Sequence, residues 1–249
     1  MSFKNTTVDD DEVAKFSALA DAWWDERGPF KPLHQFNPIR IQYIRDQITT
    51  HLVQDASQEK PFKGLTVLDV GCGGGLISEP MCRLGATVTA IDASERNIKI
   101  ASRHAMTQEL EIEYLHQTAE QVVAQERSFD VVLALEIIEH VADVGLFIGA
   151  LSQLVKPDGL LFIATLNRTP MSYVKAIVGA EYLLRWLPTG THEWKKFIRP
   201  SELSRAVEQN GLKVKEFQGF TLNILRQEWS LTAQLDVNYM AVCLRSVSE

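Results

Sequence analysis

The chain has 249 residues, 45% of them hydrophobic, which is enough to bury the core of one domain with small additions. Its 32 acidic and 25 basic residues give a net charge of −7. A negative surface disfavours attraction to phosphate backbones, so nucleic acid is not expected as a partner. Cys72, Cys82 and Cys243 form no CxxC pair, which argues against both a disulfide framework and a thiolate zinc site. The opening MSFKNTTVDDDE lacks an apolar signal core and is acidic where a transit peptide is rich in arginine, so we expect a cytoplasmic protein.

The N-terminal part of the chain is predicted to form two helices. Behind the acids at 9–12, apolar residues recur at helical spacing: Val13, Phe16, Leu19, Ala20 and Trp23. Asn37 and Pro38 are typical of the N-cap and first residue of a second helix, which continues to Leu52. We expect residues 1–60 to be a helical extension that caps a ligand site in the domain at 61–249.

From Leu65 onward, short β-rich runs alternate with helical stretches, a pattern typical of crossover units in a mostly parallel sheet. Seven strands are predicted, at residues 65–70, 87–92, 112–116, 130–135, 160–166, 212–220 and 237–244. Helices are predicted at residues 76–84, 94–107, 144–154 and 200–209. The segment KPDG at 156–159 is interpreted as a turn before the fifth strand. The expected fold class is α/β, a Rossmann-like sheet flanked by helices.

Four glycines follow the first strand in VLDVGCGGG, residues 67–75. Ligands of open α/β sheets bind at the carboxyl ends of strands, and glycines let a ligand approach the backbone N–H groups there. A dinucleotide fingerprint starting at Gly71 requires glycine at position 76, where this chain has Leu76, so a dehydrogenase is disfavoured. Asp69, at the loop entrance, favours a ligand with an ammonium group over a pyrophosphate. The alternative is a tight turn without a ligand.

The second strand, TVTAID, ends at Asp92. A carboxylate in this place can accept hydrogen bonds from both hydroxyls of a ribose. The alternative role is an N-cap of the next helix, although Ser94 is also suited to that task.

Several segments together resemble the class I S-adenosylmethionine-dependent methyltransferases: VLDVGCGGG, the acidic end of TAID, SFDVVLALEIIEH and LVKPDGLLFIATLNR. The segments NPIR, VGAEY, PTGTH and DVNYM resemble more specifically the ubiquinone biosynthesis O-methyltransferases of bacteria. This resemblance spans nearly the whole chain. It implies transfer of a methyl group from S-adenosylmethionine to a phenolic hydroxyl of 2-polyprenyl-6-hydroxyphenol or 3-demethylubiquinol.

The resemblance also implies which residues bind the donor. Gly71 and Gly73 would contact its methionine portion, and Asp92 its ribose. Arg40 of NPIR is expected to reach the methionine carboxylate from the N-terminal helices. The remaining implied contacts are with the adenosine: Leu135, Ala119 and Glu120.

Candidates for deprotonating the phenol follow the fourth strand, in LEIIEHVAD. Glu136, Glu139 and His140 combine oxygen and imidazole ligands, which suits Mg²⁺ or another divalent cation that would acidify the phenol. Alternatively His140 is the general base, because its ordinary pKa suits neutral pH, and Glu136 is a second catalytic candidate. The remaining alternative is that these residues form the solvated start of a helix, where the helix dipole favours acidic side chains.

An insertion is expected at residues 170–194, between the fifth strand and the last helix. Residues 168–199 contain six Lys or Arg and two Glu, which gives this segment a charge of +4 on an acidic protein. Such a basic, apolar segment suits an anionic lipid surface, here the inner face of the plasma membrane, and could admit a polyprenyl tail. The alternative is an ordinary lid helix packed on the core.

Two other functions stay open from the sequence. One is methylation of another small acceptor, at nitrogen or carbon. The other is a donor-binding subunit without catalysis, which organises other ubiquinone-biosynthesis proteins at the membrane. Product formed from a prenylated catechol but not from amines would favour the O-methyltransferase over both.

Overall fold

A computed structural model describes residues 6–53, 55, 57–174, 193–223 and 226–245. Its strands are β1 (Thr66–Val70), β2 (Thr87–Asp92), β3 (Ile112–His116), β4 (Phe129–Leu135), β5 (Val155–Leu166), β6 (Leu212–Asn223), β7 (Glu228–Thr232) and β8 (Asn238–Arg245). Its α-helices are α1 (Asp10–Ala18), α2 (Lys31–Leu52), α3 (Ser78–Arg83), α4 (Glu95–Thr107), α5 (Ala119–Val123), α6 (Val144–Leu154), α7 (Pro170–Ser172) and α8 (Pro200–Gln209). Short 3₁₀ helices are η1 (Ala20–Ala22), η2 (Ile138–His140) and η4 (Trp194–Lys196).

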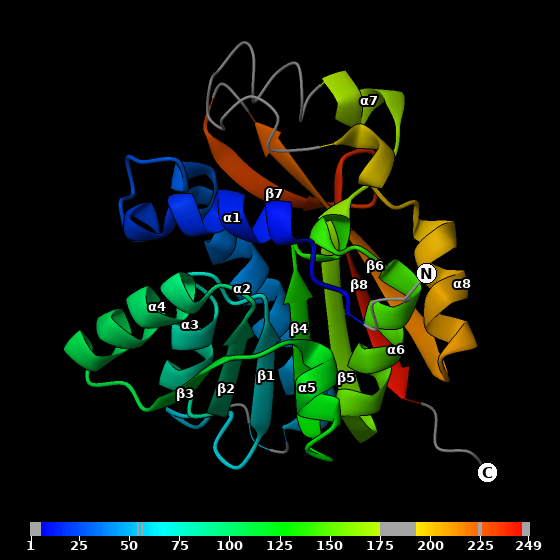
Figure 1. Ribbon diagram of the computed structural model, residues 1–249. Coiled ribbons are helices and arrows are strands. Elements are labelled where there is room, and N and C mark those ends of the chain that lie inside the picture. Colours follow the sequence, from blue (N-terminus) through cyan, green and yellow to red (C-terminus); the bar gives the residue numbers. More distant parts are fainter. Residues whose placement is uncertain (1–5, 54, 56, 175–192, 224–225, 246–249) are drawn as a thin grey trace.

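The strands form one sheet in the order β3-β2-β1-β4-β5-β8-β6-β7. Strands β1 to β5 run parallel to one another, and β8 is antiparallel to both β5 and β6. The chain proceeds outward from β1 to β3 and then returns to β4 on the other side of β1. The topological switch point, where ligands of open α/β sheets bind, therefore lies between the carboxyl ends of β1 and β4. Helix α1 lies across these ends (Figure 1).

Apolar side chains bury both faces of the sheet. One face is covered from α2 and α3, through side chains such as Ile44, Ile48 and Met81. The other is covered from α5, α6 and α8, through side chains such as Val122, Leu151 and Leu203. Because the central strands are buried on both faces, they read as nearly continuous apolar runs in the sequence.

The predicted fold class is confirmed, but the sheet has one strand more than expected. Strand β7 was not predicted, because its residues, EWSLT, are mostly exposed and form no apolar run. It pairs with β6 at the edge of the sheet. The segment KPDG lies inside β5 rather than before it, and the register shifts there between Phe129 and Val131 of β4. Asp158, with φ 60°, supplies the turn that the sequence indicated.

The predicted start of the second helix is wrong. Helix α2 begins at Lys31, and Pro38 lies inside it. A proline within a helix costs about 3 kcal/mol, but each large apolar side chain that the helix buries contributes roughly 1.5 to 3 kcal/mol. Phe36 and Ile44 are two such side chains, on either side of the proline. Asn37 does not cap the helix, since its side chain accepts hydrogen bonds from Arg40.

The first helix is confirmed, with Asp9 as its N-cap, and it continues as the 3₁₀ turn η1. Helix α5 was not predicted, and it begins with a capping box of Thr118 and Gln121. The predicted insertion at 170–194 lies mostly outside the described residues, which resume at 193. Within the described part of the chain, no helix has the length and apolar character needed to cross a membrane.

Candidate active site

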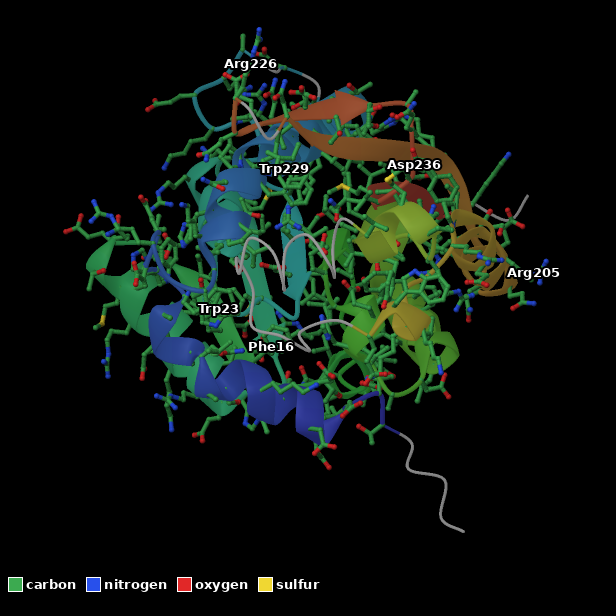
Figure 2. All side chains as sticks on the ribbon, turned by 90° about the horizontal axis from the view of Figure 1, so that it is seen from above. Phe16, Trp23, Arg205, Arg226, Trp229 and Asp236 are labelled. Carbon is green, nitrogen blue, oxygen red and sulfur yellow. The ribbon has the colours of Figure 1, made fainter. Side chains whose placement is uncertain are left out.

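A cavity of about 620 Å³ opens above the carboxyl ends of β1, β2 and β4. It is bounded by the glycine loop, by the segment after β4, by the N-terminal helices and by the β6–β7 hairpin. Seen from above (Figure 2), Phe16 and Trp23 lie on one side of the strand ends and Trp229 lies on the other. Most of the predicted donor-binding residues line this cavity: Arg40, Asp69, Gly71, Gly73, Asp92, Ala119 and Leu135.

The glycine loop packs against the protein itself more closely than the sequence suggested. A Cβ atom at Gly73 or Gly74 would overlap the ring of Trp23, and one at Gly71 would overlap Ile137. The amides of Gly71 and Cys72 donate to the carbonyl of Ile91 on β2, at 2.8 and 3.0 Å. These two amides are therefore already engaged within the protein. The glycines keep the loop thin between the strand ends and the N-terminal helices α1, η1 and α2, which are called the N-terminal cap below.

Asp92 organises the end of β2. Its Oδ2 accepts a hydrogen bond of 2.9 Å from the amide of Gly73, and its Oδ1 accepts one of 2.7 Å from the amide of Ser94. Ser94, not Asp92, is the N-cap of α4. Burial raises the pKa of Asp92 above its ordinary value, although these amides and the side chain of Asn97 act in the opposite direction. The carboxylate is thus held in a fixed orientation on the cavity wall.

Asp69 is buried at the end of β1 and accepts a hydrogen bond of 2.5 Å from the hydroxyl of Ser78. Burial raises its pKa to about 6, while Ser78 and the positive charge of Arg40 limit the rise. A cationic group in the cavity would favour the ionised form. This environment fits the ammonium group of an amino-acid ligand.

Arg40 is almost fully buried on α2, with its guanidinium beside the end of β4. Its Nη1 donates to Oε1 of Glu136 at 3.1 Å, and its Nε donates to Asn37. Burial lowers the pKa of Arg40, an effect opposed by the charges of Glu136 and Asp69. Glu136 has φ 54°, a left-handed conformation that is uncommon outside glycine. This turn directs the chain away from β4 and places the carboxylate beside Arg40.

His140 lies at the end of η2 and lines the cavity. Its Nδ1 is 2.9 Å from Oε2 of Glu12 on α1, in an ion pair that the sequence did not reveal. Burial alone lowers the pKa of His140. The hydrogen bond to Glu12, with the charges of Glu139, Glu12 and Glu136, outweighs burial and raises the pKa above its ordinary value. The hydrogen bond to His140 in turn lowers the pKa of Glu12 to about 2.

The three candidate metal ligands have separate partners. Glu136 bonds to Arg40, His140 bonds to Glu12, and Oε2 of buried Glu139 accepts a hydrogen bond of 2.9 Å from Thr165. Glu139 lines a second hollow behind η2 rather than the cavity above the strand ends. Within the described residues, no group of three or more His, Cys, Asp and Glu side chains is arranged to hold a metal ion.

The predicted adenine contacts divide in the same way. Ala119 and Leu135 line the cavity, whereas Glu120 does not, because its Oε1 accepts a hydrogen bond from the amide of Thr7 at 2.9 Å. Gln117 lines the cavity as well, and its buried Oε1 has no hydrogen-bond partner among the described residues. A buried acceptor without a partner fits the exocyclic amine of an adenine. Sequence reasoning missed Gln117 because nothing in its neighbourhood forms a motif.

Comparisons with known proteins agree with this geometry. A family model described as a methyltransferase domain matches residues 41–216. The ubiquinone biosynthesis O-methyltransferase of Parvibaculum lavamentivorans is 52% identical over 97% of this chain and 95% of its own length. The mitochondrial ubiquinone biosynthesis O-methyltransferase of Arabidopsis thaliana is 50% identical over 95% of this chain and 74% of its own length. The chain belongs to the ubiquinone biosynthesis O-methyltransferase family.

Membership of this family makes the chain an S-adenosylmethionine-dependent O-methyltransferase of ubiquinone biosynthesis, as the sequence predicted. Solved structures confirm the fold. Magnesium protoporphyrin IX methyltransferase from Synechocystis PCC 6803 with bound SAH has a TM-score of 0.67 at 18% identity, and covers 96% of this chain and all of its own. An S-adenosylmethionine-dependent methyltransferase from Clostridium acetobutylicum has a TM-score of 0.61 at 13% identity. It covers 94% of this chain and 99% of its own.

Proposed function

We propose that the acceptor is the phenolic hydroxyl of a prenylated ubiquinone precursor, 2-polyprenyl-6-hydroxyphenol or 3-demethylubiquinol. The observation that carries this proposal is the composition of the cavity. The cavity is lined by Asp69, Asp92 and the glycine loop, by His140 at the end of η2, and by mostly apolar side chains of the β6–β7 hairpin. This composition suits a nucleoside donor, a proton acceptor and a lipophilic acceptor within a single space.

The donor occupies the polar side in this proposal. Asp92 accepts the ribose hydroxyls, and Asp69 attracts the ammonium of the methionine portion. Arg40 lies beside Glu136, where it can also reach the methionine carboxylate. Gln117, Ala119 and Leu135 then enclose the adenine. These assignments rest on the placement of each side chain around the cavity.

The reaction is an in-line displacement. The phenolic oxygen forms a bond to the methyl carbon, the carbon–sulfur bond breaks with its electron pair remaining on sulfur, and the phenolic proton passes to a base. A phenol with a pKa of about 10 costs roughly 4 kcal/mol to ionise at pH 7. Alignment of the reacting atoms contributes more, about 7 to 11 kcal/mol. We therefore expect most of the rate enhancement to come from the residues that line the cavity and hold the two substrates in alignment.

His140 is the proposed general base, and Glu12 is its positioning residue. With the Nδ1 proton donated to Glu12, the lone pair of the imidazole is on Nε2, which can accept the phenolic proton. Glu12 also stabilises the imidazolium that forms. The base is thus completed by α1, a helix of the N-terminal segment.

The sequence offered an alternative to a general base, namely a divalent cation that would lower the pKa of the phenol. One buried oxygen, Oε1 of Glu139, lacks a hydrogen-bond partner within the described residues. Glu136 and His140, however, are engaged by Arg40 and Glu12, so the set does not fit a resident cation as arranged. We assign deprotonation to His140 and expect turnover to be indifferent to a chelator. Loss of turnover with EDTA and its restoration by Mg²⁺ would reverse this assignment.

The deciding experiment combines methyl-labelled S-adenosylmethionine with a panel of acceptors, read by mass spectrometry. Labelled product is expected from prenylated catechols and none from amines. Product from an amine or at a ring carbon would favour another acceptor class. Donor binding measured by calorimetry, without turnover on any phenol, would favour a binding subunit that organises other ubiquinone-biosynthesis proteins.

We also propose that the segment at 168–199 contacts an anionic lipid surface, at the inner face of the plasma membrane. Its support is the charge of this segment and the exposure of Met171, Tyr173 and Val174 at its described start. Co-sedimentation with phosphatidylglycerol vesicles is expected for the full chain and reduced after deletion of 171–187. Equal sedimentation of the two would end this proposal.

A further inference from the structure

The far side of the cavity carries three aromatic rings from distant parts of the chain: Phe36 of α2, Phe220 of β6 and Trp229 of β7. We propose that this aromatic wall seats the first isoprenoid unit attached to the acceptor ring and makes the enzyme selective for acceptors that carry such a tail. The inference rests on the proposed function, because it names how the same site recognises the non-reacting part of its substrate.

The aromatic wall is built as a fixed surface. The rings of Phe36 and Trp229 stack with centroids 4.1 Å apart, and Phe220 meets Phe36 edge to face at 5.2 Å. Phe36 and Phe220 belong to the core and are 5% and 3% exposed, whereas Trp229 is half-buried. A partly exposed ring that stacks on a buried one, itself packed against a second, offers apolar area to a ligand at little entropic cost.

The aromatic wall begins next to the polar centre of the site. The guanidinium carbon of Arg40 is 4.4 Å from the centroid of the Phe36 ring, one helical turn away on α2. The same guanidinium donates to Glu136, at the end of β4. An acceptor ring held at the segment after β4 would therefore lie close enough to Phe36 for its substituent to reach the aromatic wall. The other wall residues come from the β6–β7 hairpin, on the opposite side from Trp23 (Figure 2).

Charge distribution around the cavity selects the kind of substituent. Every Asp, Glu, Arg and His that lines the cavity in the described chain comes from residues 9–140. The described lining residues after them, at 141–238, carry no charge, and they include Leu166, Leu222 and Val237 beside the aromatic wall. Thr221 and Asn238 are the polar residues among them, so a charged substituent would lose its hydration here without gaining a counter-charge, whereas an isoprenoid unit would only remove apolar surface from water.

The test compares two catechol acceptors that differ only in a single prenyl group. For the wild type, kcat/KM is expected to be higher for the prenylated acceptor. Trp229→Ala and Leu222→Ala should each reduce the prenylated-to-bare ratio, by roughly 10-fold for the tryptophan, while turnover of the bare catechol changes little. Leu231→Ala is the matched control, since Leu231 is on the same strand but does not line the cavity.

The outcomes separate this inference from the function on which it rests. If the wild type methylates neither catechol, the proposed function fails. If it methylates both equally, or if Trp229→Ala lowers both rates in parallel with donor affinity intact, the function stands and the tail seat is wrong. If Trp229→Ala loses donor affinity in calorimetry, Trp229→Phe and Leu222→Ala carry the test, and an unchanged ratio in both overturns the inference.

Discussion

The ion pair between Glu12 and His140 joins α1 to the proposed base. Glu12 is buried, and its pKa of about 2 lies below the ordinary value of 4.5. The ionised Glu12 therefore stabilises the fold above pH 4.5, and this contribution is lost as the pH falls toward 2. The pKa of His140 is raised, so its contribution is present below pH 6.5 and is lost as the pH rises through the folded pKa. The pair therefore holds α1 most firmly in weakly acidic solution.

Replacing Glu12 should change the pH dependence of catalysis in a definite direction. A base must be unprotonated, so the acid limb of kcat/KM follows the pKa of His140. Glu12→Gln removes the negative partner and lowers that pKa, which moves the limb to lower pH and reduces the plateau rate. His140→Ala should lose about 10²- to 10⁴-fold in turnover and lose the limb altogether.

The matched control is Asp11→Asn, an exposed acid on the same helix that should leave the profile unchanged. Donor affinity measured by calorimetry should stay near the wild-type value in all three variants. An acid limb that stays at the same pH in Glu12→Gln would mean that Glu12 does not act through His140.

Asp92 is expected to contribute to donor affinity rather than to turnover. Hydrogen bonds to a charged acceptor contribute about 1.5 to 3 kcal/mol each, so Asp92→Ala should weaken donor binding roughly 10- to 100-fold or more. Isothermal calorimetry with S-adenosylhomocysteine measures the change directly. Glu95→Gln, three residues away and exposed, is the control. Wild-type affinity in Asp92→Ala would remove the ribose assignment.

At the scale of elements, the contact between the N-terminal cap and the glycine loop explains what the sequence pattern could and could not predict. The loop's position after β1 was predictable, because an apolar run ending in Asp69 and followed by glycines is a local pattern. The neighbour of the loop was not predictable. Trp23 contacts Gly73 across 50 positions of sequence, and only the path of the N-terminal segment over the strand ends brings them together. Local pattern locates an element, while topology decides what it touches.

Adding a methyl group to the loop should therefore loosen the cap. At Gly73, with φ 54°, a Cβ atom would overlap the ring of Trp23. Crowding of this kind costs about 1 to 3 kcal/mol beyond the backbone strain. Gly73→Ala should lower the free energy of unfolding by more than Gly64→Ala does, because Gly64 also has a positive φ but has no atom within 4 Å of the added carbon.

Urea unfolding of both variants measures this difference. A second substitution, Trp23→Ala, should reduce the cost of Gly73→Ala, since it removes the clashing ring. Equal costs at Gly73 and Gly64 would mean that the strain is in the backbone alone and that the cap does not press on the loop.

The sequence predicted the placement of residues that depends on their near neighbours in the chain. It did not predict contacts between residues that lie far apart in the chain. Asp92 and Leu135 end strands, so strand periodicity placed both on the correct edge of the sheet. His140 and Glu12 are 128 positions apart, and no spacing rule connects them. Phe36 and Trp229 meet because α2 packs beside an edge strand whose mostly exposed residues gave no strand signal in the sequence. The proposed base and the aromatic wall are thus formed by contacts that the periodicity of the sequence does not predict.

This assembly predicts that a donor analogue stabilises the chain as one unit, because the cavity is bounded by the N-terminal cap and by the strand ends together. At 100 times its Kd, a ligand that binds only the folded state adds about 2.7 kcal/mol. For a chain of this size we expect S-adenosylhomocysteine to raise the Tm by roughly 5 to 10 °C in a single transition, followed by calorimetry. ATP should not, since its phosphates would face Asp69 and Asp92, and Asp92→Ala should lose most of the shift. An early unfolding transition whose Tm does not change with the analogue would show that the N-terminal helices unfold separately and do not close on the donor.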